Sequence, residues 1–266
     1  MEHLLACMKI LGDDTIQRTQ LTHRIQLVKA FQITKGMKVL EIGCGQGDTT
    51  VALADAVGEN GQIVAIDIAS PEYGAPITLG EAAKAIQQSP IGSRITFQFE
   101  TDFLHFETDQ KFDVAILSHC SWYFKNPELL VSYFKKLKTM AKRVCFAEWD
   151  LDYELIPQRA HFCAVNILAL YSAFFEGDGN IQNVFHKTYI KQLLIETGFI
   201  IEQEQIVDAT YLQDGVWEID YSRELLAEFQ HAPLKIQTLV NSYVHLMNDE
   251  AKEILSLNSF VLCARA

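Results

Sequence analysis

The stretch that decides the fold runs from residue 39 to residue 48 and reads VLEIGCGQGD. An apolar run, Lys38 to Ile42, leads into three glycines at alternate positions, and Thr49 to Val57 follows with a helical pattern. Glycine allows a tight turn and a close approach of the backbone to a ligand, because no β-carbon stands in the way. A helix start also offers free backbone N–H groups. The sequence therefore predicts a buried strand, a ligand-binding turn and a helix.

The same order of strand and helix continues along the chain. Repeated strand–helix units indicate a parallel α/β sheet with right-handed crossovers. Further strands are expected at 62–66, 95–99, 112–117, 143–147, 199–207 and 259–264, and helices from 15 toward Gly36 and at 81–88, 127–140, 157–175, 187–197, 219–230 and 235–255.

Composition and charge exclude several classes of protein. The 22 basic and 34 acidic residues give a net charge of −12, which disfavours nucleic acid and anionic membrane as partners. The six cysteines form no CxxC pair and have no histidine cluster near them, so we expect no metal site and free thiols in a reducing compartment. The first residues lack a signal peptide, and the most apolar stretch, 160–175, is too short to span a membrane. We therefore expect a cytoplasmic protein without stable membrane association.

Asp67 lies 20 residues beyond Gly47, at the end of the next predicted strand. An acid at that place accepts hydrogen bonds from the two ribose hydroxyls of a nucleoside. A dinucleotide site would show the spacing GxGxxG, whereas this turn reads GxGxG and follows Glu41. A carboxylate there repels pyrophosphate and suits a cation. These features predict an adenosine-like ligand that carries positive charge.

Together these motifs resemble those of class I S-adenosylmethionine-dependent methyltransferases. Residues 41–47 match the first motif of that family, and Asp67 matches its ribose-binding acid. Asp102-Phe103 matches the acid and apolar pair that bracket the adenine, and Asp113 at the fourth strand is also typical. The resemblance implies S-adenosylmethionine as the cofactor. The cofactor-binding residues that it implies are Glu41, Gly43, Cys44, Gly45, Gln46, Gly47, Asp67, Ile68, Asp102, Phe103, Ser118 and His119.

The resemblance also implies a fold. That fold is α/β, with a Rossmann-like seven-stranded sheet of order 3-2-1-4-5-7-6, the last strand antiparallel, and inserted cap helices. The long loop 70–76 departs from the common pattern and resembles a bacterial subgroup often labelled cyclopropane-fatty-acyl-phospholipid-synthase-like. We do not expect the synthase activity, because the active-site motifs of the true synthases have no convincing match here.

The chain is expected to divide into four parts. The parts are an N-terminal helical segment (1–35), an S-adenosylmethionine-binding core (36–150), a helical cap insertion (151–186) and a segment that completes the sheet with a helical insertion near 211–256 (187–266).

Candidate catalytic residues follow the fourth and fifth predicted strands. His119 is a candidate general base, since imidazole titrates near neutral pH, or it only hydrogen-bonds the cofactor or the backbone. Trp122 and Tyr123 could wall an aromatic cage around the sulfonium or the acceptor, or belong to the core face of the next helix. Glu148 is either a second polar group of the pocket or a solvated loop acid. Our catalytic candidates are therefore His119, Tyr123 and Glu148.

Two further helical patterns bear on the site. The helix at 157–175 is apolar all round, which indicates a cap, a dimer contact or one wall of an apolar substrate pocket. We expect Phe162, Val165 or Leu168 near that pocket, and a homodimer is possible. The N-terminal helix carries Arg18, His23 and Arg24; one arginine could reach the cofactor carboxylate, although surface solvation is the expected role.

We interpret the sequence as a methyltransferase that acts on a small organic molecule, an apolar one if the helix at 157–175 lines the pocket. One alternative is a methyltransferase of RNA or protein, and the net charge disfavours the former. Another is a nicotinamide-dependent oxidoreductase, which the GxGxG spacing and Glu41 disfavour. A third is a protein that binds the cofactor without catalysis.

Overall fold

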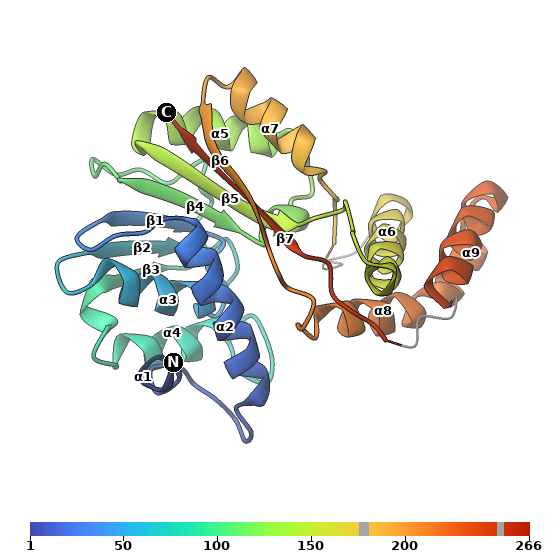
Figure 1. The fold of residues 1–266 in the computed structure, drawn as a ribbon, viewed down its shortest axis with the longest axis horizontal. Coiled ribbons are helices and arrows are strands. Elements are labelled where there is room, and N and C mark those ends of the chain that lie inside the picture. The colour runs from blue at the N-terminus through green and yellow to red at the C-terminus, as the bar shows by residue number, and fades with distance from the viewer. Residues whose placement is uncertain (176–180, 249–252) are drawn as a thin grey trace.

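A computed structural model of the chain describes residues 1–175, 181–248 and 253–266. Its centre is a seven-stranded sheet of order β3-β2-β1-β4-β5-β7-β6 (Figure 1). Strand β7 runs antiparallel to both its neighbours, and the other neighbouring pairs are parallel. The predicted fold class and strand order are confirmed. The strands are β1 (Lys38–Ile42), β2 (Gln62–Ile66), β3 (Ile95–Gln98), β4 (Val114–Ser118), β5 (Arg143–Trp149), β6 (Ile200–Val207) and β7 (Ser259–Arg265).

Helices cover both faces of the sheet. Side chains along a strand alternate between its faces. Val39 of β1 packs in one cluster with helices α2 and α3, whereas its neighbour Leu40 packs in another with α5 and α7. The sheet is therefore buried on both sides, which explains its nearly continuous apolar strands. The helices are α1 (Glu2–Leu5), α2 (Thr15–Ala30), α3 (Asp48–Val57), α4 (Leu79–Gln87), α5 (Leu129–Met140), α6 (Arg159–Phe174), α7 (Lys187–Glu196), α8 (Asp214–Glu224) and α9 (Leu234–Asn248).

Helices α6, α8 and α9 form a separate group at one end of the sheet (Figure 1). Their shared core contains Cys163 and Ile167 of α6, Ile219 of α8 and Val240 of α9. The apolar helix predicted at 157–175 is α6. Parts of the predicted cap (176–180) and of the predicted helix 235–255 (249–252) lie outside the described residues.

Several predicted boundaries were wrong, among them those of β5, α8 and α5. Strand β5 continues to Trp149, because Glu148 and Trp149 pair with Phe260 and Ser259 of β7. Helix α8 begins at Asp214, five residues before the predicted start. Helix α5 begins at Leu129, so the proline at 127 precedes the helix instead of opening it. The β5 and α8 boundaries both change the site, since the first makes Glu148 a strand residue and the second adds Asp214, Trp217 and Glu218 to a helix beside it.

Within the described ranges, no helix has both the length and the apolarity that crossing a membrane requires.

Candidate active site

The turn after β1 depends on glycine at two positions. Gly43 has a φ of +77°, and a Cβ there would lie 2.6 Å from the Cβ of Cys120. Gly45 has a φ of +53°, and a Cβ built on it meets no described atom within 4 Å. Any side chain at Gly43 would collide with the loop after β4. The backbone at Gly45, in contrast, is open to a ligand.

Glu41 is a buried carboxyl group at the end of β1. Its Oε2 accepts a hydrogen bond of 2.6 Å from the Thr50 hydroxyl. Burial raises the pKa of Glu41 to about 8, against the opposing effect of the Thr50 hydrogen bond. Burial also raises the pKa of Asp48, at the start of α3. No Lys or Arg of the described chain forms an ion pair with Glu41, so this region favours a bound cation.

Asp67 follows β2 and faces the same turn. Its Oδ2 accepts from the Gly45 N–H at 2.8 Å and its Oδ1 from the Ala69 N–H at 2.9 Å. Each carboxylate oxygen retains capacity for a further donor. The neighbouring Ile68 is 69% exposed, so an apolar surface lies open beside this carboxylate.

Asp102 and Phe103, the predicted pair after β3, lie in different surroundings. The Asp102 carboxylate accepts from the Leu104 N–H at 2.8 Å and lies 3.0 Å from Nδ1 of His105. Phe103 is buried and packs edge-on against Tyr133, with ring centroids 4.8 Å apart. Asp102 is therefore available at the surface, whereas the Phe103 ring supports the site from the core.

His119 lies immediately after β4 with an unusual φ of +50°. Its backbone N–H donates to the Ala147 carbonyl at 2.9 Å. Its Nε2 lies 3.0 Å from Ser259 Oγ, and the same Oγ lies 3.0 Å from Nε2 of His23. Burial, together with nearby Arg24 and His119, lowers the pKa of His23 to about 2. A neutral, buried imidazole and a serine hydroxyl thus fix one nitrogen of His119.

Glu148 fixes the other side of this ring. Its Oε1 lies 3.2 Å from Nδ1 of His119, a distance suited to an ion pair but without hydrogen-bond alignment. Its Oε2 accepts from the Ser121 hydroxyl at 2.8 Å, and its Oε1 accepts from the Trp149 N–H at 3.2 Å. The predicted alternative of a solvated loop acid was wrong, because Glu148 is buried within β5.

These groups border a cavity of about 510 Å³, which we call the histidine cavity. Trp122 is 3% exposed, and its indole N–H finds no partner in the described chain. Tyr123 is 56% exposed at the same cavity. The lining residues are Arg24, His119, Trp122, Tyr123, Glu148, Trp149, Leu168, Ile181, Asp214, Trp217, Glu218 and Tyr221.

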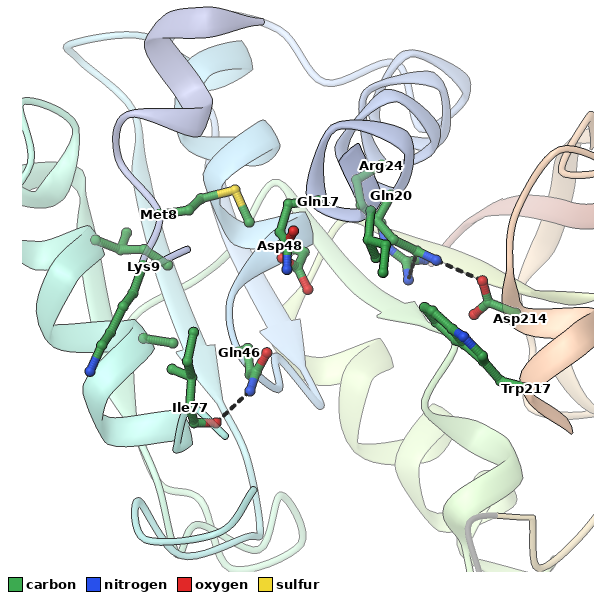
Figure 2. Close-up of a pocket in the computed structure, with 13 residues that line it drawn as sticks. Met8, Lys9, Gln17, Gln20, Arg24, Gln46, Asp48, Ile77, Asp214 and Trp217 are labelled. Carbon is green, nitrogen blue, oxygen red and sulfur yellow. Dashed lines mark hydrogen bonds between the residues drawn. The ribbon is translucent and has the colours of Figure 1, made fainter. Parts of the chain in front are cut away.

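A second cavity of about 310 Å³ adjoins the β1 turn, and we call it the turn cavity (Figure 2). Gln46 and Asp48 line it, and the Gln46 amide donates to the Ile77 carbonyl at 2.6 Å. Arg24, Asp214 and Trp217 line both cavities, which are therefore neighbours. In Figure 2, Gln20 donates to Asp214 across this boundary, at 2.6 Å.

The structure brings the predicted residues together in two groups. The first surrounds the β1 turn and Asp67, and the second contains His119, Tyr123 and Glu148. Of the predicted cap residues, Leu168 lines the histidine cavity. Arg24 is half-buried and lines both cavities, whereas Arg18 pairs with Glu2 and Asp14; contact of an arginine with the cofactor carboxylate stays a prediction.

Sequence reasoning missed three contributors to the site. Ser259 gave no signal, because it contacts the two histidines only through the pairing of β7. His23 was noted on its helix, but its burial depends on the same strand. The face of α8 did give a signal, since 214, 217, 218 and 221 have helical spacing. It was missed because the helix was predicted to begin at 219.

Comparison with known proteins gives consistent matches. The family model of the methyltransferase domain matches residues 33–198. A cyclopropane-fatty-acyl-phospholipid synthase-like protein from Lactobacillus casei ATCC 334 is 32% identical, with a TM-score of 0.90 over 100% of this chain and 98% of its own. Magnesium protoporphyrin IX methyltransferase (ChlM) from Synechocystis PCC 6803, solved with bound SAH, shares the fold at 14% identity, with a TM-score of 0.52 over 99% of this chain and 93% of its own.

Among curated relatives, methyltransferase phomM of Diaporthe leptostromiformis is 30% identical over 161 residues. The match covers 52% of this chain and 42% of phomM, so the chain spans about two fifths of that relative's length.

Proposed function

The chain belongs to the methyltransferase-domain family, and from that premise we propose that it transfers a methyl group from S-adenosylmethionine to a small organic molecule. The observation that carries the proposal is the pair of adjoining cavities. One borders the β1 turn, and the other borders His119 and Glu148. A volume of about 510 Å³ is in the range of small-molecule sites.

The residues at the β1 turn fit this cofactor. Glu41 is a buried carboxyl that forms no ion pair with a Lys or Arg of the described chain, although Arg24 is near enough to oppose the rise in its pKa; such a group suits a ligand that carries an ammonium and a sulfonium. The open backbone at Gly45 admits close approach, and Asp67 retains acceptor capacity for ribose hydroxyls. The exposed Ile68 offers an apolar surface for a base. S-adenosylmethionine, when bound, supplies a methyl group on a sulfonium sulfur that departs as a neutral thioether.

The chain's own residues would align the acceptor and manage its proton. In the proton arrangement that we propose, Ser259 donates to the neutral His23 and accepts from Nε2–H of His119. Nδ1 of His119 then holds a lone pair beside Glu148, 3.2 Å away. Nδ1 is buried in the described chain, so the hydroxyl or ammonium of an acceptor must enter between this nitrogen and Glu148 to give up its proton there, and the Glu148 carboxylate would then hold that proton. The buried rings of Trp122 and Trp149 would shield the inner side of the acceptor from water.

Calorimetric titration tests the cofactor. We expect S-adenosylmethionine and S-adenosylhomocysteine to bind and NAD not to bind. Preferential binding of NAD would overturn the proposal. Product analysis on a panel of small molecules against RNA and protein then tests the acceptor class, since the net charge of −12 disfavours nucleic acid.

A further inference from the structure

Helix α8 presents one face to the histidine cavity. Asp214, Trp217, Glu218 and Tyr221 line the cavity and stand three, four and seven residues along the helix from the first. Such spacing places side chains on one side of a helix. The face therefore offers two carboxyl groups and two aromatic rings to whatever the cavity binds.

The charge of this cavity is mainly negative. Three carboxyl groups line it, on Glu148, Asp214 and Glu218, whereas Arg24 is the one Lys or Arg in the lining of described residues. Asp214 accepts from the neutral amide of Gln20, at 2.6 Å. In the described chain, none of the three carboxyl groups forms an ion pair with a Lys or Arg. The protein thus leaves negative charge uncompensated around this space.

Glu218 is held in place without being neutralised. The buried ring of His161 accepts the Leu257 N–H on its Nδ1, at 2.8 Å. A ring that accepts on Nδ1 carries its proton on Nε2 and is neutral. That Nε2 therefore donates to Oε2 of Glu218, at 2.7 Å. The neutral histidine orients the carboxylate at the cavity wall and leaves its charge for a ligand.

Aromatic rings form most of the remaining wall. They belong to Trp122, Tyr123, Trp149, Trp217 and Tyr221. The Trp217 ring is 46% exposed, although it lies at the cavity. The buried Trp122 offers an indole N–H for which the described residues supply no acceptor. An exposed aromatic ring and an unpaired N–H donor both lack partners in the described chain, which indicates that a ligand contacts them.

We propose that the histidine cavity binds a small apolar amine in its protonated form, with the ammonium against the α8 face and the apolar part against Leu168 and Ile181. Carboxylates and aromatic faces together are the chemistry that recognises an organic cation. An acidic acceptor would instead meet three carboxyl groups. That this amine is the methyl acceptor rests on the proposed function; its binding does not.

The tryptophans provide the readout. All three tryptophans of the chain line the histidine cavity, so intrinsic fluorescence reports on it directly. The probes are cyclohexylmethylamine, cyclohexylmethanol and cyclohexanecarboxylate, which share a skeleton and differ in charge. We expect the amine to bind at least roughly tenfold more tightly than the alcohol, and the carboxylate most weakly. An alcohol that binds as tightly as the amine, or a carboxylate that binds best, would overturn the inference.

Two matched variants localise the effect. Glu218→Gln removes the charge but keeps an acceptor for His161. It should lower the affinity for the amine about tenfold and leave the affinity for the alcohol unchanged. Asp220→Asn removes the same charge from the same helix, at a side chain that is 62% exposed and pairs with Arg223. It should leave the affinity for the amine unchanged. Equal effects of the two variants would contradict a local site.

Titration of the same preparations with S-adenosylhomocysteine separates the two proposals. If S-adenosylhomocysteine binds and the cavity does not prefer the amine to the alcohol, the methyltransferase proposal stands and this inference fails. If the amine binds preferentially and S-adenosylhomocysteine does not bind, this inference stands and the methyltransferase proposal fails.

Discussion

Glu41 and Glu148 are both buried glutamates near the carboxyl ends of parallel strands, yet the protein treats them differently. In the described chain, the Glu41 side chain accepts one hydrogen bond, from Thr50, and its pKa is raised by burial. Glu148 accepts from Ser121 and from the Trp149 N–H and lies beside His119. A buried carboxyl group needs partners to remain charged. Glu41 therefore needs a cation from a ligand to become charged, whereas the protein itself supplies the hydrogen bonds of Glu148.

This difference separates two kinds of site residue. An incompletely satisfied group contributes to binding energy, because the ligand supplies what is missing. A satisfied group contributes to orientation, because its geometry is fixed before any ligand arrives. We accordingly expect substitutions near β1 to change affinity and stability, and substitutions near β4 and β5 to change turnover.

The largest effect is expected for His119→Ala. If His119 takes the acceptor's proton, turnover should fall by roughly 10²-fold or more while the affinity for S-adenosylmethionine changes little. Steady-state kinetics and calorimetry on the same variant provide the test. His245→Ala, at an exposed histidine of α9, is the control and should leave turnover unchanged. Lost affinity with normal turnover at saturation would make His119 a cofactor contact instead.

A smaller effect concerns the pH dependence of stability. The folded pKa of Glu41, about 8, lies above its ordinary value of 4.5, so the folded state holds this proton more tightly than the unfolded state. The resulting stabilisation is complete below the ordinary pKa and is lost as pH rises toward 8. Glu41→Gln stays neutral, so between pH 6 and 8 the wild type should lose about 2 kcal/mol more free energy of unfolding than the variant.

Urea unfolding of both proteins at pH 6, 7 and 8 measures this difference. Glu148→Gln is the matched comparison. It replaces a carboxylate that accepts two donors, so it should destabilise the protein at each pH. Parallel pH profiles for the wild type and Glu41→Gln would show that the folded state does not hold the Glu41 proton more tightly than the unfolded state.

The two glutamates also differ in how much of their surroundings could be predicted from the sequence. Glu41 stands in a contiguous motif of strand, glycine turn and helix, so its place followed from local rules. Glu148 required the antiparallel pairing of β5 with β7, from 110 residues further along the chain, as did the contact of Ser259 with His119. Sheet order followed from the family resemblance, but the side chains that a distant strand places against a site leave no local pattern.

A third prediction tests the affinity role of the β1 region. Asp67→Asn keeps an acceptor but removes the charge from a group expected to accept ribose hydroxyls. The dissociation constant of S-adenosylhomocysteine should rise about tenfold, because hydrogen bonds to a charged acceptor are the stronger ones. Asp109→Asn, at an exposed acid in the loop before β4, removes the same charge as a control. Equal dissociation constants for the two variants would remove Asp67 from the site.

The smallest effect is expected for Tyr123→Phe. Tyr123 lines the histidine cavity, and its hydroxyl forms no hydrogen bond with the described residues. Removing this hydroxyl therefore leaves no protein partner unsatisfied, and the ring that borders the cavity remains. Turnover should therefore change by less than about threefold, in contrast to His119→Ala. A loss of tenfold or more in turnover at saturating acceptor would place the Tyr123 hydroxyl at the reacting atoms. The end of β4 would then have two groups that handle the acceptor's proton, His119 and Tyr123, instead of one.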